Sequence, residues 1–348
     1  MIWYVYPMWH KVSFSLIAEK HVEQLRKYFR VYTIDELVFP NIYPATRPLV
    51  IVQPFFWPMV RASKRLERLL ARIRGIIGVD VADSDRISNL AVSMTHYAEC
   101  MIVPSTWARD AYIRSGCKIP VHVVPHGLDP QYFGPRTRVQ SFKEIADLKR
   151  RKGYKYMLFF CWHSEYRKGL DLVLEFYERV RRERKDLVLI AKFMTGSGQP
   201  HKMIRHLGGI IVAGWLSEEQ KIELYDICDI YLLFSRGGGF ELNGLEAIAR
   251  EEVVLAANRG PWTEYLPDFC LVECKEAPYV LKNNDIHCGK GVEILVDRAV
   301  DRICEIADDL EEYKARVREY VEKRIKNRFT WEIVGRRLAD IVRQYLSR

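Results

Sequence analysis

Residues 235–252 read SRGGGFELNGLEAIAREE, and the glycines in this stretch separate two elements of different kinds. The apolar run IYLLFS (230–235) predicts a β-strand, and LNGLEAIAR (242–250) predicts a helix. A glycine turn between a strand and a helix presents free backbone N–H groups and the positive end of the helix dipole. Both favour an anion such as phosphate. The stretch therefore predicts a phosphate-facing turn in an α/β protein.

The same alternation of strands and helices continues on both sides of this turn. In the second half of the chain we expect strands at 156–162, 187–193, 209–214, 230–235 and 253–257, and helices at 169–184, 217–228, 242–250 and 291–325. In the first half we expect strands at 2–6, 31–34, 48–54, 76–82, 100–105 and 122–126, and helices at 13–29, 61–74 and 105–116. Nearly continuous apolar strands between helices predict parallel sheets covered on both faces.

A polar and basic segment, residues 134–155, divides the 348-residue chain into two such halves. We expect an α/β fold with two Rossmann-like, doubly wound parallel-sheet domains facing a cleft. The N-terminal domain is expected over residues 1–135 and the second over 136–325, with a C-terminal helix over 326–348 packing back on the first domain. Ligands of such sheets bind beyond the carboxyl ends of the strands.

Composition narrows the classes of protein and partner. The net charge of +9 favours anionic partners, and no apolar run approaches the roughly 20 residues of a membrane span. The start MIWYVYPMWHKVSF does not have the pattern of a signal peptide, so a cytoplasmic protein is expected. The eight cysteines are scattered, which predicts reduced thiols and no metal site. The richness in arginine, lysine and glutamate is typical of a thermophile.

The segment RASKRLERLLARIR (61–74) has six basic residues and one glutamate. Its apolar side chains fall on one helical face. Two interpretations stay open: a helix that packs on the sheet with a solvated basic face, or a face that rests on an anionic membrane surface.

Two more segments point to the edge of the sheet that carries the glycine turn. CWHSEYRKGLDLVLEFY (161–177) places Lys168 between a strand and a helix, where its ammonium can face phosphate as a point charge. VPSTWARDAYIRSGCKIPVHVVPHGLDPQYF (103–133) has a helix between two strands and then a sharp turn at 125–129.

Taken together, these segments resemble the retaining glycosyltransferases of family 4. The resemblance is carried by VPSTWARDAYIRSG…PVHVVPHGLD, KGLDLVLEFY, GWLSEEQKIELYDICDIYLLFSRGGGFELNGLEAIA and RFTWEIVGRRLADIVRQY (328–345). It implies the GT-B fold, with a nucleotide-sugar donor on the C-terminal domain, an acceptor on the N-terminal domain, and no metal ion or other cofactor.

The resemblance also implies roles for single residues. Lys168 contacts the donor diphosphate, and Glu246, the second glutamate of the E-x7-E motif, holds the ribose. Trp215 lines the nucleobase site. The donor turn is formed by Gly238, Gly239, Phe240, Glu241, Leu242 and Asn243.

The sequence departs from this family at the positions nearest the chemistry. The first glutamate of the motif falls at Gly238, and the arginine expected before the lysine falls at Trp162. We expect Glu241 to replace the missing glutamate, and Asp85 lies about where the family has a histidine, so Glu241, Lys168 and Asp85 are the catalytic candidates. Other polar side chains expected near the cleft are His10, Lys11, His126 and His163.

The expected function is hexosyl transfer from a UDP- or GDP-sugar to a hydroxyl of a glycan, lipid or protein acceptor, with retention of configuration. The alternative is a degenerate relative that binds a nucleotide sugar without turning it over, which Gly238 and Trp162 favour. Binding to nucleic acid is not expected, because no segment resembles a known reader motif. Peripheral contact with an anionic membrane through 61–74 is expected if the acceptor is a lipid.

Overall fold

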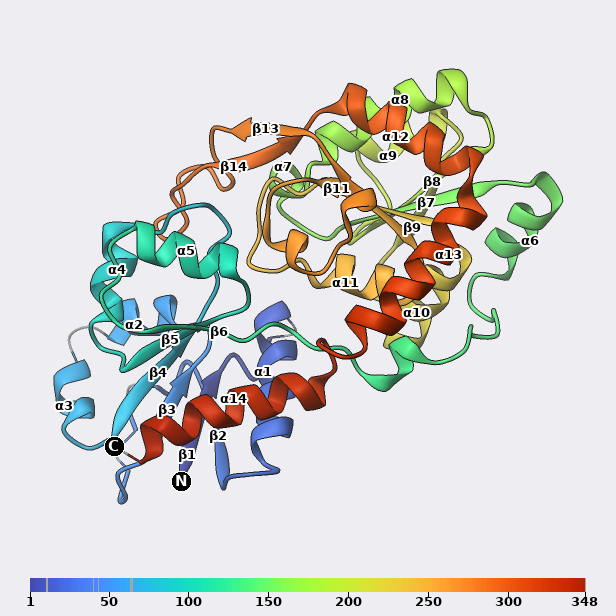
Figure 1. Ribbon diagram of the computed structural model, residues 1–348. Helices are drawn as coiled ribbons and strands as arrows, with labels where there is room; N and C mark the ends of the chain where they lie inside the picture. The colour runs from blue at the N-terminus through green and yellow to red at the C-terminus, as the bar shows by residue number, and fades with distance from the viewer. Residues whose placement is uncertain (11, 40, 43, 63–64, 348) are drawn as a thin grey trace. The chain divides into compact units, whose positions relative to one another are not determined.

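The structure is a computed structural model that describes residues 1–10, 12–39, 41–42, 44–62 and 65–347 (Figure 1). The chain forms two compact units. Unit 1 comprises Met1–Gly127, Lys282–Gly289 and Arg328–Arg348, and unit 2 comprises Leu128–Leu281 and Lys290–Asn327. Unit 1 therefore ends at Gly127 rather than at 135, and it includes a short segment that the sequence pattern places in the second domain.

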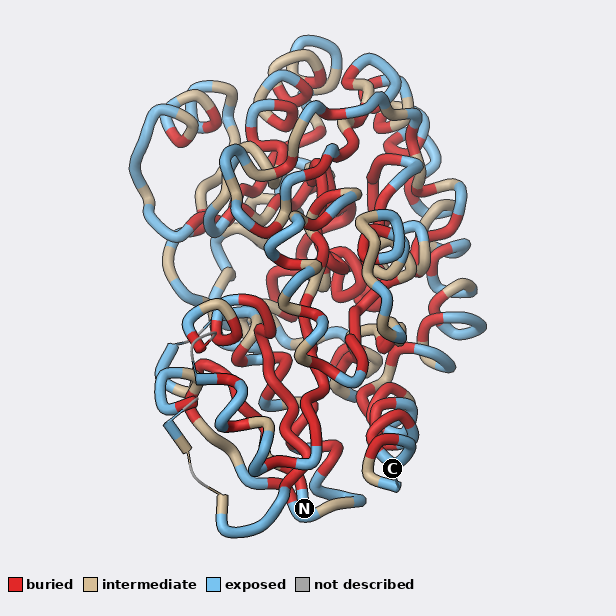
Figure 2. Tube along the Cα trace, turned by 90° about the vertical axis from the view of Figure 1, so that its left-hand side faces the viewer, coloured by how far each residue is buried: buried red, intermediate tan, exposed pale blue. Residues whose placement is uncertain are grey.

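Unit 1 is built on a six-stranded parallel sheet in the order β2-β1-β3-β4-β5-β6. Its strands are β1 (Ile2–Tyr6), β2 (Val31–Asp35), β3 (Leu49–Val52), β4 (Gly75–Val79), β5 (Cys100–Val103) and β6 (Val121–Val123). Its helices are α1 (Ser13–Leu25), α2 (Phe56–Ala62), α3 (Leu66–Leu70), α4 (Asn89–Thr95), α5 (Thr106–Arg114) and α14 (Trp331–Leu346). The central strands β3, β4 and β5 are buried along their whole length, whereas the edge strands β2 and β6 are partly exposed. Figure 2 shows the buried interior in red and the exposed periphery in pale blue.

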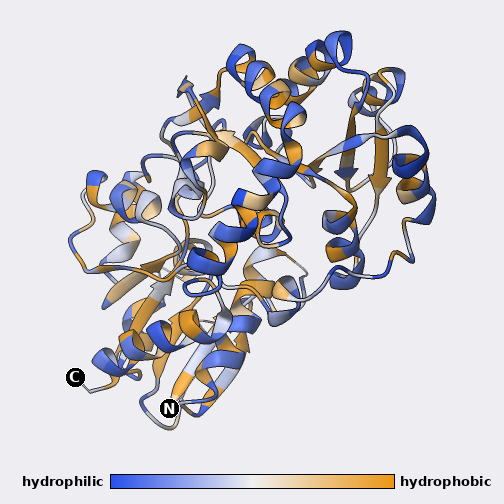
Figure 3. Cartoon of the chain, turned by 45° about the vertical axis from the view of Figure 1, so that its right-hand side comes forward, coloured by the Kyte–Doolittle hydropathy of each residue, from blue (hydrophilic) through white to orange (hydrophobic). Residues whose placement is uncertain are grey.

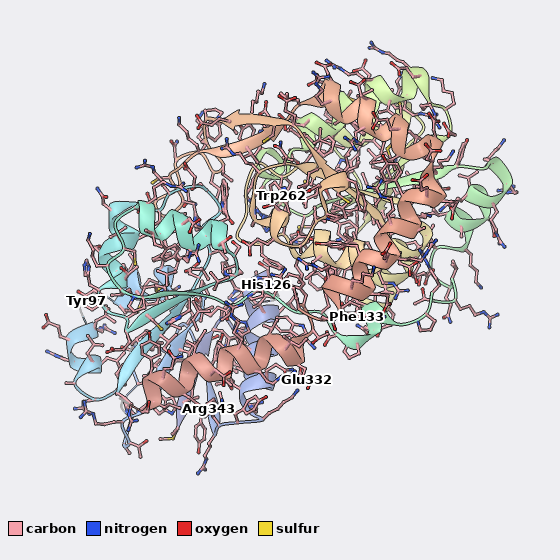
Figure 4. All side chains as sticks on the ribbon, viewed as in Figure 1. Tyr97, His126, Phe133, Trp262, Glu332 and Arg343 are labelled. Atoms are coloured by element: carbon pink, nitrogen blue, oxygen red, sulfur yellow. The ribbon has the colours of Figure 1, made fainter. Side chains whose placement is uncertain are left out.

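The C-terminal helix α14 packs on α1 within unit 1. Gly335 allows this close approach, because a Cβ there would lie 2.6 Å from Cβ of Gln24. Figure 4 labels Glu332 and Arg343 along this helix. Ile286, from the segment Lys282–Gly289, is buried in the hydrophobic core of unit 1.

The single helix expected over 61–74 is wrong. Helix α2 ends at Ala62, α3 covers only Leu66–Leu70, and residues 71–74 form turns and bends. Residues 63–64 lie outside the described part of the chain. Leu66, Leu69 and Ile73 are nevertheless buried, as their spacing predicts. Leu66 and Leu69 lie on α3 and Ile73 lies in the bend that follows it, so the segment buries its apolar side chains without forming one continuous helix.

Unit 2 has a second six-stranded parallel sheet, in the order β12-β11-β10-β7-β8-β9. Its strands are β7 (Lys155–Cys161), β8 (Leu187–Phe193), β9 (Ile210–Ala213), β10 (Ile230–Leu233), β11 (Val253–Ala257) and β12 (Leu271–Val272). An antiparallel hairpin of β13 (Cys274–Ala277) and β14 (Gly291–Ile294) accompanies it. Figure 3 shows the apolar strands in orange between more hydrophilic helices. The expectation of two parallel α/β sheets is confirmed.

Helices flank the sheet of unit 2. They are α6 (Lys143–Lys152), α7 (Glu165–Lys168), α8 (Leu170–Glu183), α9 (Gln199–His206), α10 (Glu218–Ile227), α11 (Leu242–Ala249), α12 (Val296–Asp308) and α13 (Leu310–Tyr320). Short 3₁₀ turns occur at Pro130–Phe133, Pro261–Glu264 and Asp268–Cys270, and a π-helical turn covers Val321–Ile325. One expectation is wrong here: residues 291–294 form a strand rather than the start of a helix. The polar segment 134–155 contains α6.

Two buried side chains fix the loops around β11. The indole of Trp262, labelled in Figure 4, is fully buried and donates to the carbonyl of Ala257 at 2.6 Å. The guanidinium of Arg250 pairs with Asp226 at 2.7 Å and also donates to the carbonyls of residues 131, 132, 134 and 135. The chain that enters unit 2 is thereby tied to the end of α11. All eight cysteines are free thiols.

Candidate functional site

The glycine turn after β10 is brought close to the loop that follows β7. Gly169 has a φ of +73°, and a Cβ on it would lie 2.1 Å from the carbonyl oxygen of Phe234, at the end of β10. Only glycine fits such a position. The N–H of Arg236 donates to the carbonyl of Arg167 at 2.7 Å. Arg167 and Lys168 therefore lie beside the turn.

These two cations hold the carboxylate of Glu241. Nη1 of Arg167 lies 3.1 Å from Oε1 of Glu241, and Nζ of Lys168 lies 2.5 Å from Oε2. All three side chains are largely buried. The cluster of Arg167, Lys168 and Glu241 has a net charge of one positive unit, because two cations share one carboxylate. A shielded excess of positive charge suits a diphosphate.

Gly238 is small because Glu241 needs the space. A Cβ on Gly238 would lie 2.5 Å from Oε1 of Glu241. None of Gly237, Gly238 and Gly239 has a positive φ; Glu241 itself does, at +64°. The glycine run thus serves close approach rather than a left-handed backbone. The carboxylate of Glu241 fills the space that a side chain at 238 would use.

Arg236 braces the same turn from the opposite side. It is buried, and its guanidinium donates to both carboxylate oxygens of Asp171 at 2.7 Å and to Glu293 at 2.8 Å. It also lies 3.9 Å from the ring centre of Tyr166. Burial opposes its charge, but the hydrogen bonds of Asp171 and Glu293 leave the pKa of Arg236 raised. The turn is therefore held rigidly in place.

Glu246 forms a second polar cluster one turn into α11. Its carboxylate accepts from Nζ of Lys221 at 2.8 Å, from the hydroxyl of Tyr225 at 2.8 Å and from Nδ2 of Asn243 at 3.1 Å. Burial and the charge of Glu246 raise the pKa of Tyr225 well above its usual value. Burial works against the charge of Lys221, but Glu246 and Glu218 outweigh it and raise the pKa of that lysine. Three donors thus hold the carboxylate of Glu246 in one orientation.

The rest of the glycine turn packs on the core of unit 2. The ring of Phe240 is buried 5.2 Å from that of Tyr265, whose hydroxyl donates to the carbonyl of Glu241 at 2.7 Å. Leu242 is the first residue of α11, so the N–H groups at the start of this helix lie next to Glu241.

A third cluster lies at the carboxyl ends of β7, β8 and β9. The indoles of Trp162 and Trp215 meet edge to face with centres 5.5 Å apart, and they are 36% and 54% exposed. The ammonium of Lys192, on β8, lies 4.2 Å from the ring centre of Trp162. Burial, with a smaller effect of Lys221, lowers the pKa of Lys192 to about 8.

The other predicted site residues are not part of these clusters. His163, in unit 2, is exposed, and its Nδ1 is 2.8 Å from the hydroxyl of Ser164. In unit 1, Asp85 pairs with Arg114 at 3.5 Å, and His10 is an exposed loop residue after β1. His126, labelled in Figure 4, is buried against Trp331; burial and His21 lower its pKa to about 3. Lys11 lies outside the described residues.

Neither a metal cluster nor a membrane span is found in the described ranges. Asp83 and Asp85 have D-x-D spacing, but no group of three metal-ligating side chains occurs among the described residues. No helix in the described part of the chain is both long and apolar enough to cross a bilayer.

Three residues of the site, Arg167, Lys221 and Tyr225, are not predicted by any sequence motif. Arg167 was visible only as the neighbour of Lys168. Lys221 and Tyr225 are four residues apart in the predicted helix 217–228, so they share one face of it. This spacing is the signal that could have found them as partners of one buried acid.

The sequence of the chain is similar to those of glycosyltransferases and of viral proteins. Residues 141–277 match the family described as glycosyl transferases group 1. The chain is 33% identical over 356 residues to uncharacterized protein 356 of Sulfolobus islandicus rod-shaped virus 1, covering 99% of this chain and 98% of that protein. It is 27% identical over 194 residues to putative glycosyltransferase 45 of Sulfolobus islandicus filamentous virus (isolate Iceland/Hveragerdi), covering 54% of this chain and 50% of that one.

Solved structures share the architecture at low sequence identity. HepE of Anabaena in complex with UDP and glucose superposes with a TM-score of 0.72 at 13% identity, over 99% of each chain. Sucrose-phosphate synthase of Thermosynechococcus elongatus gives 0.70 at 12% identity, over 100% of this chain and 99% of that one. The chain therefore has the GT-B fold, carries a glycosyl transferases group 1 domain, and belongs to the family of protein 356 of the rod-shaped virus.

Proposed function

We propose that the protein transfers a hexose from a UDP- or GDP-sugar to an acceptor hydroxyl, with retention of configuration and without a metal ion. The observation that carries this proposal is the cluster of Arg167, Lys168 and Glu241 at the glycine turn. The complex of HepE with UDP and glucose supports a nucleotide sugar as the ligand of this fold.

The cluster at the glycine turn and the cluster around Glu246 have different tasks in this proposal. Arg167 and Lys168 stabilise the negative charge that develops on the leaving diphosphate, as fixed cations in a largely buried site do. Glu246 accepts hydrogen bonds from the ribose hydroxyls. Glu241 orients the two cations and faces the donor sugar. The bond from the sugar to the diphosphate breaks, the acceptor oxygen bonds to the sugar, and the acceptor proton leaves with the nucleoside diphosphate.

The alternative is a protein that binds a nucleotide sugar without turnover. Gly238 and Trp162, at the places of the usual glutamate and arginine, motivated it. The pairing of Glu241 with Arg167 and Lys168 weakens this motive, since a carboxylate and a second cation are both available from nearby positions.

A thermal-shift and turnover experiment tests the proposal. Melting curves are recorded with UDP, GDP, CDP, ADP and their sugars, because a ligand of the native state raises Tm by mass action. Donor hydrolysis and transfer are then followed with the ligand that binds. Lys168→Ala should weaken binding at least about tenfold, whereas Lys152→Ala, an exposed lysine of α6, should leave it unchanged. A shift without turnover supports the alternative; no shift with any nucleotide contradicts both.

We also propose that the acceptor is lipid-linked and reaches unit 1 at an anionic membrane. Exposed apolar side chains gather where β1, β2 and β3, adjacent in the sheet, end: Trp9 is 77% exposed, Leu37 58%, Val38 52% and Trp57 46%. Arg61, one turn after Trp57 on α2, pairs with Glu36 at 3.1 Å. Asp35 accepts from the N–H groups of Met8 and Leu37, each at 2.9 Å, and so ties two of these loops together.

We call Trp9, Leu37, Val38, Trp57 and Arg61 the Trp9 patch. Aromatic and aliphatic groups beside a cation suit the headgroup boundary of an anionic bilayer. This contact involves only the start of the basic segment 61–74. Sedimentation with phosphatidylglycerol vesicles should capture the protein at low salt, and Leu37→Ser with Trp57→Ser should reduce capture several-fold. Leu90→Ser, on α4, is the matched control. If the double variant is captured as well as the wild type, the Trp9 patch is not the surface that contacts the membrane.

A further inference from the structure

Lys192 is a buried cation that has no ion-pair partner among the described residues. It is 8% exposed, and no carboxylate or carbonyl oxygen of the described residues accepts a hydrogen bond from its ammonium. Its contact is the face of Trp162, and the neighbouring charge is a second cation, Lys221, which already pairs with Glu246 and Glu218. Burying an unpaired ammonium is costly. A ligand that supplies an acceptor would reduce this cost.

The sheet order places Lys192 in line with the other clusters. The carboxyl ends of β10, β7, β8 and β9 are consecutive in the sheet of unit 2. The glycine turn follows β10, Trp162 follows β7, Lys192 lies near the end of β8, and Trp215 follows β9. Adjacent strands are about 4.8 Å apart, so this row spans about 14 Å. An extended nucleoside diphosphate with its phosphates at the glycine turn and its ribose at Glu246 would place its base beside Lys192.

We infer that Lys192, Trp162 and Trp215 form the base subsite of the donor and that Lys192 selects bases with a carbonyl oxygen at C4 of a pyrimidine or at C6 of a purine. This inference rests on the proposed function and names its nucleotide class. The partly exposed indoles offer faces for stacking, which is insensitive to the identity of the base.

The selectivity follows from the chemistry of the ammonium, which has donors and no acceptor. Uracil presents an oxygen at C4 and guanine an oxygen at C6, and either can accept from Lys192. Cytosine and adenine have an amino group at the corresponding position, which presents hydrogens to the ammonium instead. A uridine or guanosine donor is therefore favoured over a cytidine or adenosine donor.

Binding of four nucleotides and of inorganic pyrophosphate tests the inference. Dissociation constants of UDP, GDP, CDP, ADP and pyrophosphate are measured by calorimetry on the wild type, Lys192→Met, Lys192→Arg and the surface control Lys185→Met. The wild type should bind UDP or GDP about 10- to 100-fold more tightly than CDP and ADP, the range expected for one hydrogen bond to a charged group. Lys192→Met should remove this preference and leave pyrophosphate binding unchanged. Lys192→Arg should retain part of it, and Lys185→Met all of it.

The outcomes separate this inference from the proposed function. If nucleotides and pyrophosphate bind but Lys192→Met keeps the wild-type preference, the base subsite is wrong and the proposed function stands. If neither nucleotides nor pyrophosphate bind, the proposed function itself fails. Trp215→Ala provides a second measurement should Lys192→Met fold poorly, because the exposed ring of Trp215 can be removed without opening the core. This variant should weaken the binding of all four nucleotides and leave the binding of pyrophosphate unchanged.

Discussion

The carboxylate of Glu241 occupies the space of the side chain that Gly238 lacks, with its Oε1 2.5 Å from where a Cβ on residue 238 would lie. A glutamate three positions along the turn thus reaches the place expected of one at 238. The arginine of the site is likewise found at another position. The family's arginine is expected at 162, where this chain has Trp162, and the guanidinium of Arg167 pairs with the carboxylate of Glu241 instead. The charges of the site are kept while the residues that carry them differ.

This relationship predicts that exchanging the two residues preserves the site. Gly238→Glu alone should destabilise the fold, because the new Cβ meets Glu241, and Glu241→Gly alone should lower transfer at least about 100-fold through the lost carboxylate. The double variant Gly238→Glu/Glu241→Gly removes the clash and also the left-handed strain at 241, which costs about 1–3 kcal/mol. It should recover stability and much of the rate.

Initial transfer rates and melting curves of the four proteins check this prediction. Glu241→Gln is the isosteric control and should be as inactive as Glu241→Gly. A double variant that melts like Gly238→Glu, or that transfers no faster than Glu241→Gly, would show that the two positions are not equivalent.

Arg167→Met should weaken binding of the nucleoside diphosphate about 10- to 100-fold and reduce turnover, because a charged hydrogen-bond donor is lost from the diphosphate site. Glu241 would keep Lys168 as a partner, so the fold should survive. Calorimetry with UDP or GDP measures the loss. Arg151→Met, an exposed position of α6, should bind like the wild type.

Stability should fall in mild acid because of His21. Burial lowers the pKa of His21 to about 4, and its Nδ1 lies 2.8 Å from the hydroxyl of Tyr4. Below pH 6.5 the unfolded chain binds a proton that the folded chain does not, so the free energy of unfolding drops by up to about 1.4 kcal/mol per pH unit until about pH 4. Urea unfolding between pH 7 and pH 5 should therefore show a shallower slope in His21→Gln, and equal slopes would contradict this assignment.

Glu252 should affect stability in the opposite direction. It is fully buried in unit 2, neither carboxylate oxygen has a hydrogen-bond partner among the described atoms, and burial raises its pKa well above the usual value. A raised folded pKa favours the fold at low pH, and the benefit is lost as pH rises. Glu252→Gln should therefore raise Tm by a few degrees at pH 8 and by less at pH 4.5. Glu144→Gln, an exposed substitution in α6, should change neither value.

Sequence patterns predicted the two sheets and the glycine turn well, because apolar strands and glycines act locally. The basic helix 61–74 was wrong, and so was the start of the helical segment 291–325, for a common reason; the rest of that segment forms α12, α13 and the π-helical turn. Their apolar spacing fits a helix, yet the segments are divided by tertiary packing, and residues 291–294 pair with β13 instead. The spacing of apolar residues along the chain does not show which of these segments will pack or pair with another part of the protein instead of forming a helix.

The site was predictable in part only. Lys168 and Glu246 could be placed from the resemblance, and Glu241 was proposed from its nearness to Gly238. The partners Arg167, Lys221 and Tyr225 depend on which side chains meet across loops and helices. The left-handed backbone at Glu241, an uncommon conformation for glutamate, is what directs its carboxylate toward position 238.

The chain order of unit 1 has a consequence for its biosynthesis. Its core includes Ile286, and its helix α1 is covered by α14, which ends at Leu346. A ribosome releases Ile286 only after Leu128–Leu281 of unit 2 has been translated, and it releases α14 only after the whole of unit 2. The N-terminal sheet must therefore wait, incompletely covered, until the last residues emerge, whereas all of unit 2 is synthesised by Asn327. We expect the usual N-to-C order of domain folding to be reversed in this protein.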